Sequence, residues 1–202
     1  MLQLDLLRHG QTELGHTLRG YTDDALTPEG WQQMQFAVLE KLQQPVQWQA
    51  IYSSTLIRCS HFARQLSQQL KLPLILNSDL KEMNFGQWEG CSTEEIYQRE
   101  PELLASFWEK PSFYTPPEAE PLHEFQYRIQ RAFQLIHQQM LENNWRQVLV
   151  ICHGGVIKLM KCLALDQSPD HLLKIPAELG QLHTLYLNPH NPQSYALEAS
   201  EK

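Results

Sequence analysis

Short apolar runs alternate along this chain with longer stretches in which apolar residues recur every three or four positions. The short runs predict buried strands, and the longer stretches predict amphipathic helices. We expect strands at 2–8, 50–52, 74–76, 148–151, 182–187 and 195–197, the last of them at a sheet edge. We expect helices at 27–45, 56–70, 122–143 and 156–165. This alternation predicts an α/β fold, a three-layer α/β/α sandwich with a mostly parallel central sheet.

Two of the expected helices have clear local signals. Thr27-Pro28-Glu29 is a helix start: Thr27 caps the first turn, Pro28 suits the first helical position, and Glu29 favours the positive end of the helix dipole. The apolar face of that helix carries Trp31, Met34, Val38 and Leu42. The helix at 122–143 has one continuous apolar face, formed by Phe125, Ile129, Phe133, Ile136 and Met140.

The segment at about 77–117 differs from the rest because it is dense in aromatic residues and prolines. We interpret it as an insertion of short helices and loop that covers a site, since long connections in compact domains often have such a function. The whole chain, 1–202, is then expected to be a single domain.

Composition narrows the class of protein. The 202 residues are 42% apolar and 19% charged, and the formal net charge is −7. This charge argues against a nucleic-acid or membrane partner, so an anionic substrate would have to be attracted by a local cluster of arginines. The four cysteines show no metal-binding spacing and are expected to be free thiols. Without a signal-peptide pattern or a membrane-spanning apolar stretch, we expect a cytoplasmic protein.

Two histidines follow expected strands from distant parts of the sequence. One lies in Arg8-His9-Gly10 and the other in His153-Gly154-Gly155. Because ligands of open α/β sheets bind beyond the carboxyl ends of the strands, both histidines are candidates for one site. An imidazole there can be a nucleophile, and Arg8 can donate two hydrogen bonds to a phosphate. A histidine at the edge of the core with a solvated arginine remains the alternative interpretation.

Two further charged groups fit this site. Arg58 lies on the first turn of a helix that follows a strand, at the same sheet edge, although a surface arginine is the commoner case. Glu82 lies among apolar and aromatic residues, where partial burial would suit it to donate a proton to a leaving group. Glu89 is the competing acid, and a structural role is the alternative for both. Cys152 should point to the opposite side from His153 and is interpreted as a core residue.

Together these segments resemble the histidine phosphatase superfamily, which has the phosphoglycerate mutase-like fold. The resemblance covers nearly the whole chain: Arg8-His9-Gly10 with Thr12, then Arg19-Gly20 and Asp23, Leu26 to Gly30, Ser53 to Arg58, Glu82 to Gly90 and Val148 to Gly155. Two positions depart from the pattern. Gly15 stands where the family usually has a phosphate-binding asparagine. His16 is a candidate substitute, although a histidine of a mobile loop without this role is the favoured interpretation. Ala119-Glu120-Pro121 stands where many members have Gly-Glu-Ser.

The resemblance implies a role for each site residue. His9 would accept the phosphoryl group, and Glu82 would protonate the departing alcohol and then help to activate water. His153 would act in catalysis and, with Arg8, Arg58 and Gly154, bind the phosphoryl oxygens. The substrate side would be formed by Gln11, Thr12, Arg19 and Gly20. No metal and no cofactor are implied, because arginines neutralise the phosphoryl charge.

The resemblance also favours an activity. Phosphoglycerate mutases are usually longer after the acid and at the tail, so this shorter chain favours hydrolysis of a small phosphorylated substrate. The segment Glu82 to Glu89 is most similar to that of the alpha-ribazole phosphatases, which act in assembly of the cobalamin nucleotide loop. The alternatives are another phosphomonoesterase, a mutase-like enzyme, and a phospho-ligand-binding protein with little turnover. We expect a monomer or a homodimer.

Overall fold

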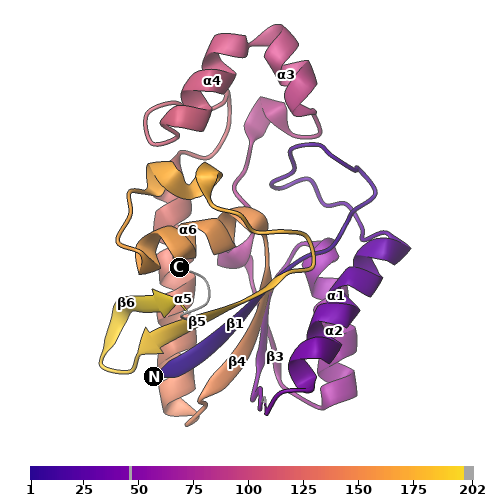
Figure 1. Cartoon of the computed structure of the whole chain (residues 1–202), viewed down its shortest axis with the longest axis vertical. Coiled ribbons are helices and arrows are strands. Elements are labelled where there is room, and N and C mark those ends of the chain that lie inside the picture. Colours follow the sequence, from indigo (N-terminus) through magenta and orange to yellow (C-terminus); the bar gives the residue numbers. More distant parts are fainter. Residues whose placement is uncertain (46, 198–202) are drawn as a thin grey trace.

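A six-stranded sheet runs through the centre of the protein (Figure 1). The computed structural model describes residues 1–45 and 47–197. The strands are β1 (Leu2–Arg8), β2 (Ile51–Ser54), β3 (Leu74–Asn77), β4 (Gln147–Cys152), β5 (Leu182–Asn188) and β6 (Asn191–Leu197). They lie in the order β3-β2-β4-β1-β5-β6. The pairs β2–β3, β2–β4 and β1–β4 are parallel, and β5 and β6 close the sheet as an antiparallel hairpin.

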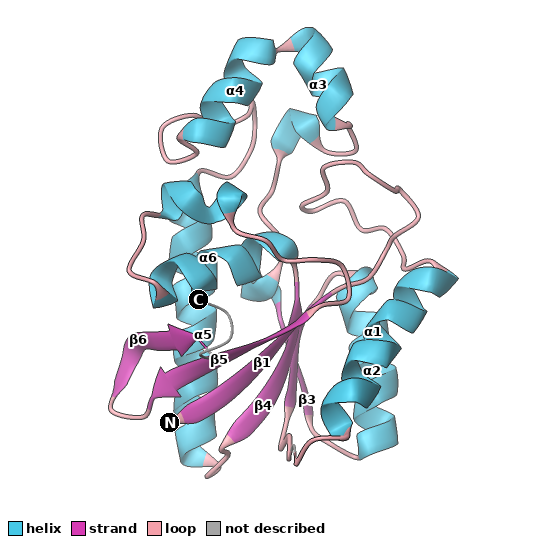
Figure 2. Cartoon of the chain, in the orientation of Figure 1, coloured by secondary structure: helices cyan, strands magenta, loops and turns pink. Residues whose placement is uncertain are grey.

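Helices cover both faces of this sheet (Figure 2). One face carries α1 (Pro28–Leu42) and α2 (Ile57–Leu70), and the other carries α5 (Leu122–Glu142) and α6 (Gly154–Ala164). Two short helices, α3 (Thr93–Arg99) and α4 (Pro101–Glu109), lie beyond the carboxyl ends of the parallel strands. Short 3-10 turns occur at Ser78–Leu80, Gly86–Trp88 and Pro169–Lys174. The predicted α/β/α sandwich is confirmed, and the 77–117 segment contains the short helices α3 and α4.

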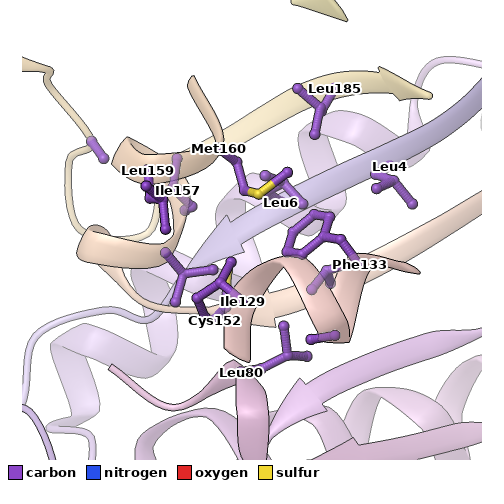
Figure 3. Packing of buried hydrophobic residues seen from close by; sticks show 14 of the residues in the cluster. Leu4, Leu6, Leu80, Ile129, Phe133, Cys152, Ile157, Leu159, Met160 and Leu185 are labelled. Carbon is purple, nitrogen blue, oxygen red and sulfur yellow. The ribbon is translucent and has the colours of Figure 1, made fainter. Parts of the chain in front are cut away.

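Strand alternation divides the core into two parts. Leu4 and Leu6 of β1 point towards α5 and α6, where they join Ile129, Phe133 and Met160 (Figure 3). Leu7 points the opposite way, into the cluster beneath α1 and α2. Both faces of the central strands are therefore apolar, as buried parallel strands require. Cys152 is fully buried in the α5–α6 cluster, which confirms its interpretation as a core residue.

Two details of the helices differ from the sequence-based expectation. Leu42 is 38% exposed because it lies at the end of α1, where it lines a surface groove between α1 and α2. Gly154 and Gly155, expected as a turn, already belong to the first turn of α6. The backbone N–H groups of a first helical turn have no partner within the helix, so these glycines bring donors to the sheet edge that can bind groups outside the helix.

Candidate active site

His9 and His153 lie side by side at the carboxyl edge of the sheet. The parallel register of β1 and β4 pairs Arg8 with Cys152, so the residue after each strand is a histidine. The backbone N–H of His9 donates to the carbonyl of Cys152 at 3.1 Å. The two imidazole rings are 5.2 Å apart between centroids and meet edge to face at 62°. The two histidines expected in one site are therefore brought together.

The His9 imidazole is arranged as a neutral nucleophile. Its Nδ1 lies 2.8 Å from the carbonyl oxygen of Gly10. A carbonyl can only accept, so Nδ1 donates and Nε2 keeps its lone pair. Burial, followed by the positive charges of Arg58 and Arg8, lowers the pKa of His9 well below its ordinary value. Nε2 therefore stays unprotonated at neutral pH.

Two arginines beside His9 carry guanidinium nitrogens without a protein partner. Arg58 is fully buried and donates to the carbonyls of Thr22 and Gly20, each at 2.8 Å. Arg8 donates from Nη1 to the carbonyl of Ala177. The Nε atoms of both arginines are buried and have no hydrogen-bond partner among the described residues. Buried cationic donors left unpaired are costly unless an anion binds them. This arrangement defines an anion pocket around His9.

The Glu82 carboxyl group lines the same cavity as Arg8 and His9 and is only 8% exposed. Its Oε1 accepts from the backbone N–H of Met83 at 3.0 Å, and its Oε2 accepts from that of Gly155 at 2.9 Å. The second donor belongs to the first turn of α6. Two backbone donors therefore hold the carboxyl group in one orientation beside the anion pocket.

Glu89, the competing acid, has a structural role. Its carboxylate accepts from the backbone N–H groups of residues 20, 21, 22 and 85, and from the Thr22 hydroxyl at 2.6 Å. Burial acts to raise the pKa of Glu89, but the hydrogen bonds from Thr22, Phe85 and Tyr21 outweigh it and lower the pKa. Glu89 thus fastens the loop that in turn holds Arg58, and Glu82 is the acid at the pocket.

The loop that carries Glu82 is held from behind by Arg128. This guanidinium binds the Glu120 carboxylate with two hydrogen bonds, of 2.6 and 2.8 Å. It also donates to the backbone carbonyls of Asp79, Lys81 and Glu82 at 2.7 to 2.8 Å. Glu120, the retained acid of the divergent 119–121 element, therefore supports the Glu82 loop through Arg128.

The pocket opens into a cavity of about 360 Å³. Its polar wall includes Arg8, His9, Arg19, Glu82 and Lys158, and its apolar wall includes Phe85, Phe107, Trp108, Leu172 and Leu173. Lys158 is half-buried and has no hydrogen bond or ion pair within the described chain. Despite the net charge of −7, the cavity itself is therefore rich in cations.

The residues expected on the substrate side separate into two groups. Arg19 lines the cavity, as does the exposed His16. Thr12 and Gly20 are buried behind the wall, where Thr12 accepts from Arg19 and Gly20 supplies its carbonyl to Arg58. The backbone of Gln11 is bound to the start of α1. Gln11, Thr12 and Gly20 thus support the cavity wall from behind and are not among the described residues that line the cavity.

The position of the missing asparagine has its own geometry. Gly15 has a φ of +61°, in the left-handed region that glycine adopts without strain. Its carbonyl accepts from the guanidinium of Arg19, and Gly15 and Gly154 both line the cavity. Gly15 therefore orients Arg19 through its backbone, and a role for His16 in place of the asparagine stays a prediction.

Three residues near the site were not assigned a role from sequence. Ser54 contacts His153, Arg128 supports the Glu82 loop, and Lys158 lines the cavity. Ser54 could have been found, because it ends β2, which pairs in parallel with β4, so its side chain reaches the same edge as His153. The contacts of Arg128 and Lys158 depend on how α5 and α6 pack, for which the sequence carries no local signal.

Two properties of the described residues, 1–45 and 47–197, bear on other site types. No group of three or more His, Cys, Asp and Glu residues there is placed to hold a metal ion. None of the helices in the same part of the chain is long and apolar enough to cross a membrane.

The fold and the site together define an α/β protein with a buried anion pocket around a neutral histidine. The chain belongs to the histidine phosphatase superfamily (branch 1), which it matches over residues 4–199. The solved structure of Bacillus stearothermophilus YhfR is similar, with a TM-score of 0.82 and 28% identity over 96% of this chain and 94% of that one. The phosphoglycerate mutase-like fold expected from sequence is confirmed.

Relatives of this chain differ in length and name. A bifunctional protein of Mycobacterium tuberculosis is 33% identical over 182 residues, which are 89% of this chain and 49% of the relative. This chain thus spans about half the length of that curated relative. The adenosylcobalamin/alpha-ribazole phosphatase of Escherichia coli is 27% identical over 161 residues, covering 79% of this chain and 77% of the relative.

Proposed function

We propose that this protein is a phosphomonoesterase that acts through a phosphohistidine at His9. The observation that carries the proposal is that the buried Nε atoms of Arg8 and Arg58, which have no hydrogen-bond partner among the described residues, lie beside His9, whose Nδ1 is bound to the Gly10 carbonyl. A phosphoryl group is an anion whose charge is spread over several oxygens, and fixed cationic donors stabilise its transfer. The remaining donors of the pocket, His153 and the first turn of α6, complete the environment that such a group needs.

In the first step the lone pair of His9 Nε2 attacks the phosphorus atom. A P–N bond forms while the bond between phosphorus and the ester oxygen breaks. The Glu82 carboxyl group gives its proton to the departing alkoxide, which leaves as an alcohol. Arg8, Arg58 and His153 hold the phosphoryl oxygens during this transfer.

In the second step a water molecule attacks the phosphohistidine. The Glu82 carboxylate accepts the proton of that water, a P–O bond forms, and the P–N bond breaks. The products are inorganic phosphate and His9 in its original state. No metal or cofactor takes part in either step of this proposal.

For the substrate we propose alpha-ribazole 5′-phosphate, in assembly of the cobalamin nucleotide loop. The Glu82–Glu89 segment resembles the alpha-ribazole phosphatases, and the named relative from E. coli supports the same choice. The apolar wall offers Phe107 and Trp108 to a flat, apolar leaving group such as a benzimidazole nucleoside. On this proposal the protein acts in the cytoplasm on a small phosphorylated substrate.

Hydrolysis of p-nitrophenyl phosphate in the presence of a chelator tests the activity. We expect turnover by the intact protein, loss of turnover in His9→Ala, and an acid-labile phosphohistidine after a rapid quench. Turnover that survives in His9→Ala, or label found on a cysteine, would contradict the mechanism. Binding of phosphate without turnover would favour the phospho-ligand-binding alternative.

A panel of phosphate monoesters tests the substrate separately. We expect alpha-ribazole 5′-phosphate to have a higher kcat/KM than 3-phosphoglycerate or phosphoserine. Faster release of phosphate from 3-phosphoglycerate would overturn the substrate and leave the phosphohistidine chemistry intact. Isomerisation of that compound without release of phosphate would indicate a mutase.

A further inference from the structure

The His153 imidazole has a fixed neighbour on the adjacent strand. Ser54 is the last residue of β2, which pairs in parallel with β4, so its side chain lies at the same edge as His153. Both residues are fully buried, and Ser54 Oγ is 2.8 Å from His153 Nε2. Either atom could donate in this hydrogen bond. The direction decides which nitrogen of His153 carries the ring proton.

The other contacts of Ser54 decide the direction. Its Oγ already accepts from the backbone N–H of Leu56 at 3.3 Å. The neighbouring Ser53 hydroxyl donates to the Ser54 carbonyl at 2.9 Å and does not bind its Oγ. Among the described residues, the Ser54 hydroxyl hydrogen has only one acceptor within reach, His153 Nε2. A buried hydroxyl hydrogen without an acceptor is energetically costly, so Ser54 should donate and Nε2 should accept.

The surroundings of the ring agree with this assignment. Cys59 Sγ lies 3.7 Å from Nε2 and 3.9 Å from Nδ1, and its S–H donates to the Cys152 carbonyl at 3.4 Å. Burial raises the pKa of Cys59 to about 12, so this group is a neutral thiol and a weak acceptor. Burial, followed by the charge of Arg58, lowers the pKa of His153 well below its ordinary value. A neutral ring has one proton, and Nδ1 is the nitrogen left to carry it.

We propose that Ser54 is a positioning residue, whose hydroxyl donates to His153 Nε2 and thereby places the ring proton on Nδ1, ready to bind a phosphoryl oxygen. Only the naming of that ligand rests on the proposed function. The wrong tautomer would present a lone pair to an anion, so the direction of one serine hydrogen bond determines whether His153 attracts or repels the phosphoryl group.

Nitrogen NMR of histidine-labelled, ligand-free protein tests the tautomer directly. The His153 signals are identified by their loss in His153→Gln. We expect the wild-type protein to have a protonated Nδ1 and an unprotonated Nε2 on a neutral ring. We expect Ser54→Ala to shift the ring towards the Nε2-protonated form or a mixture. Ser53→Ala, which keeps the Ser54–His153 contact, is the matched control and should resemble the wild type.

The same variants test the consequence for binding. Ser54→Ala should weaken inhibition by inorganic phosphate by roughly tenfold, as expected for loss of a hydrogen bond to a charged ligand, while Ser53→Ala and Ser54→Thr should leave it within about twofold. A wild-type His153 protonated on Nε2 would overturn the inference, whatever the Ser54 variants do. The correct tautomer in a protein without phosphatase activity would support Ser54 and contradict the proposed function.

Discussion

The backbone N–H of Gly155 donates to Glu82 Oε2 at 2.9 Å, and a Cβ on Gly155 would lie only 2.3 Å from Oε1 of the same carboxyl group. The helix that begins at the His153 edge therefore approaches the acid as closely as the backbone permits. A side chain at position 155 would have to displace Glu82, whereas the helical backbone itself would tolerate alanine.

We predict that Gly155→Ala lowers the activity towards substrates with poor leaving groups. A displaced Glu82 can no longer protonate an alkoxide, which should lower kcat/KM for alkyl phosphates by about 10²-fold. p-Nitrophenyl phosphate, whose leaving group hardly needs an acid, should change by less than about threefold. Steady-state kinetics on both substrates measure the difference.

Two comparisons sharpen this prediction. Glu82→Gln should show the same selectivity, and adding Gly155→Ala to it should cause little further loss, because both changes remove one interaction. In Gly154→Ala the new Cβ would lie 3.1 Å from Arg8 Nε. This variant should therefore lower kcat/KM for both substrates to a similar extent. If Glu82→Gln lowered kcat/KM equally for both substrates, Glu82 would not be the general acid.

We predict that Arg128→Met destabilises the protein by about 3 kcal/mol, because Glu120 is left as a half-buried charge without its partner. Three backbone carbonyls of the Glu82 loop also lose their donor. Urea denaturation measures the change. The double variant Glu120→Gln/Arg128→Met should recover part of the loss, and a double variant less stable than Arg128→Met would contradict this explanation.

We predict that stability falls on acidification below about pH 6.5, the ordinary pKa of histidine. The folded-state pKa values of His9 and His153 are lowered, so below pH 6.5 the unfolded chain binds protons that the folded protein does not. His9 and His153 each then lower the free energy of unfolding by up to about 1.4 kcal/mol per pH unit, until the folded pKa is reached.

Denaturation midpoints at pH 7.5, 6.0 and 5.0 measure this slope. His9→Asn should reduce the slope, because one of the two imidazoles whose pKa burial lowers is removed. His61→Gln changes an exposed histidine and serves as the control. Parallel pH dependence in His9→Asn and the wild type would show that His9 does not contribute to it.

We predict that Lys158→Met makes the protein more stable and less active. The half-buried ammonium has no partner in the described chain, and burial lowers the pKa of Lys158. Replacing it with an apolar side chain should raise the unfolding free energy by about 0.5–2 kcal/mol. KM for anionic phosphate esters should rise, since the cavity loses one cation. The exposed Lys174 provides a control, Lys174→Met, that should change neither quantity.

Much of the fold and the centre of the site could be predicted from sequence. Apolar runs located the strands, and the rule that parallel strands end at one edge predicted a common site for His9 and His153. The residues alone did not separate Glu82 from Glu89, because both acids lie in the same motif, and only the family resemblance favoured Glu82. The structural difference depends on five donors that surround Glu89, four of which come from residues 20–22, far away in the chain. The support of Glu82 by Arg128 likewise joins segments whose contact only tertiary packing determines.

The sheet order has a consequence for how the protein is made. β1, which carries Arg8 and leads into His9, is bonded on one side to β4 and on the other to β5, both of which come much later in the chain. During synthesis, the amino-terminal strand must wait for most of the protein before it acquires either neighbour. Such non-local pairing slows folding, and an incomplete chain that ends before β4 lacks His153 and cannot complete the anion pocket. On the proposed function, catalytic competence should therefore arise late, when β4 enters the sheet between β1 and β2.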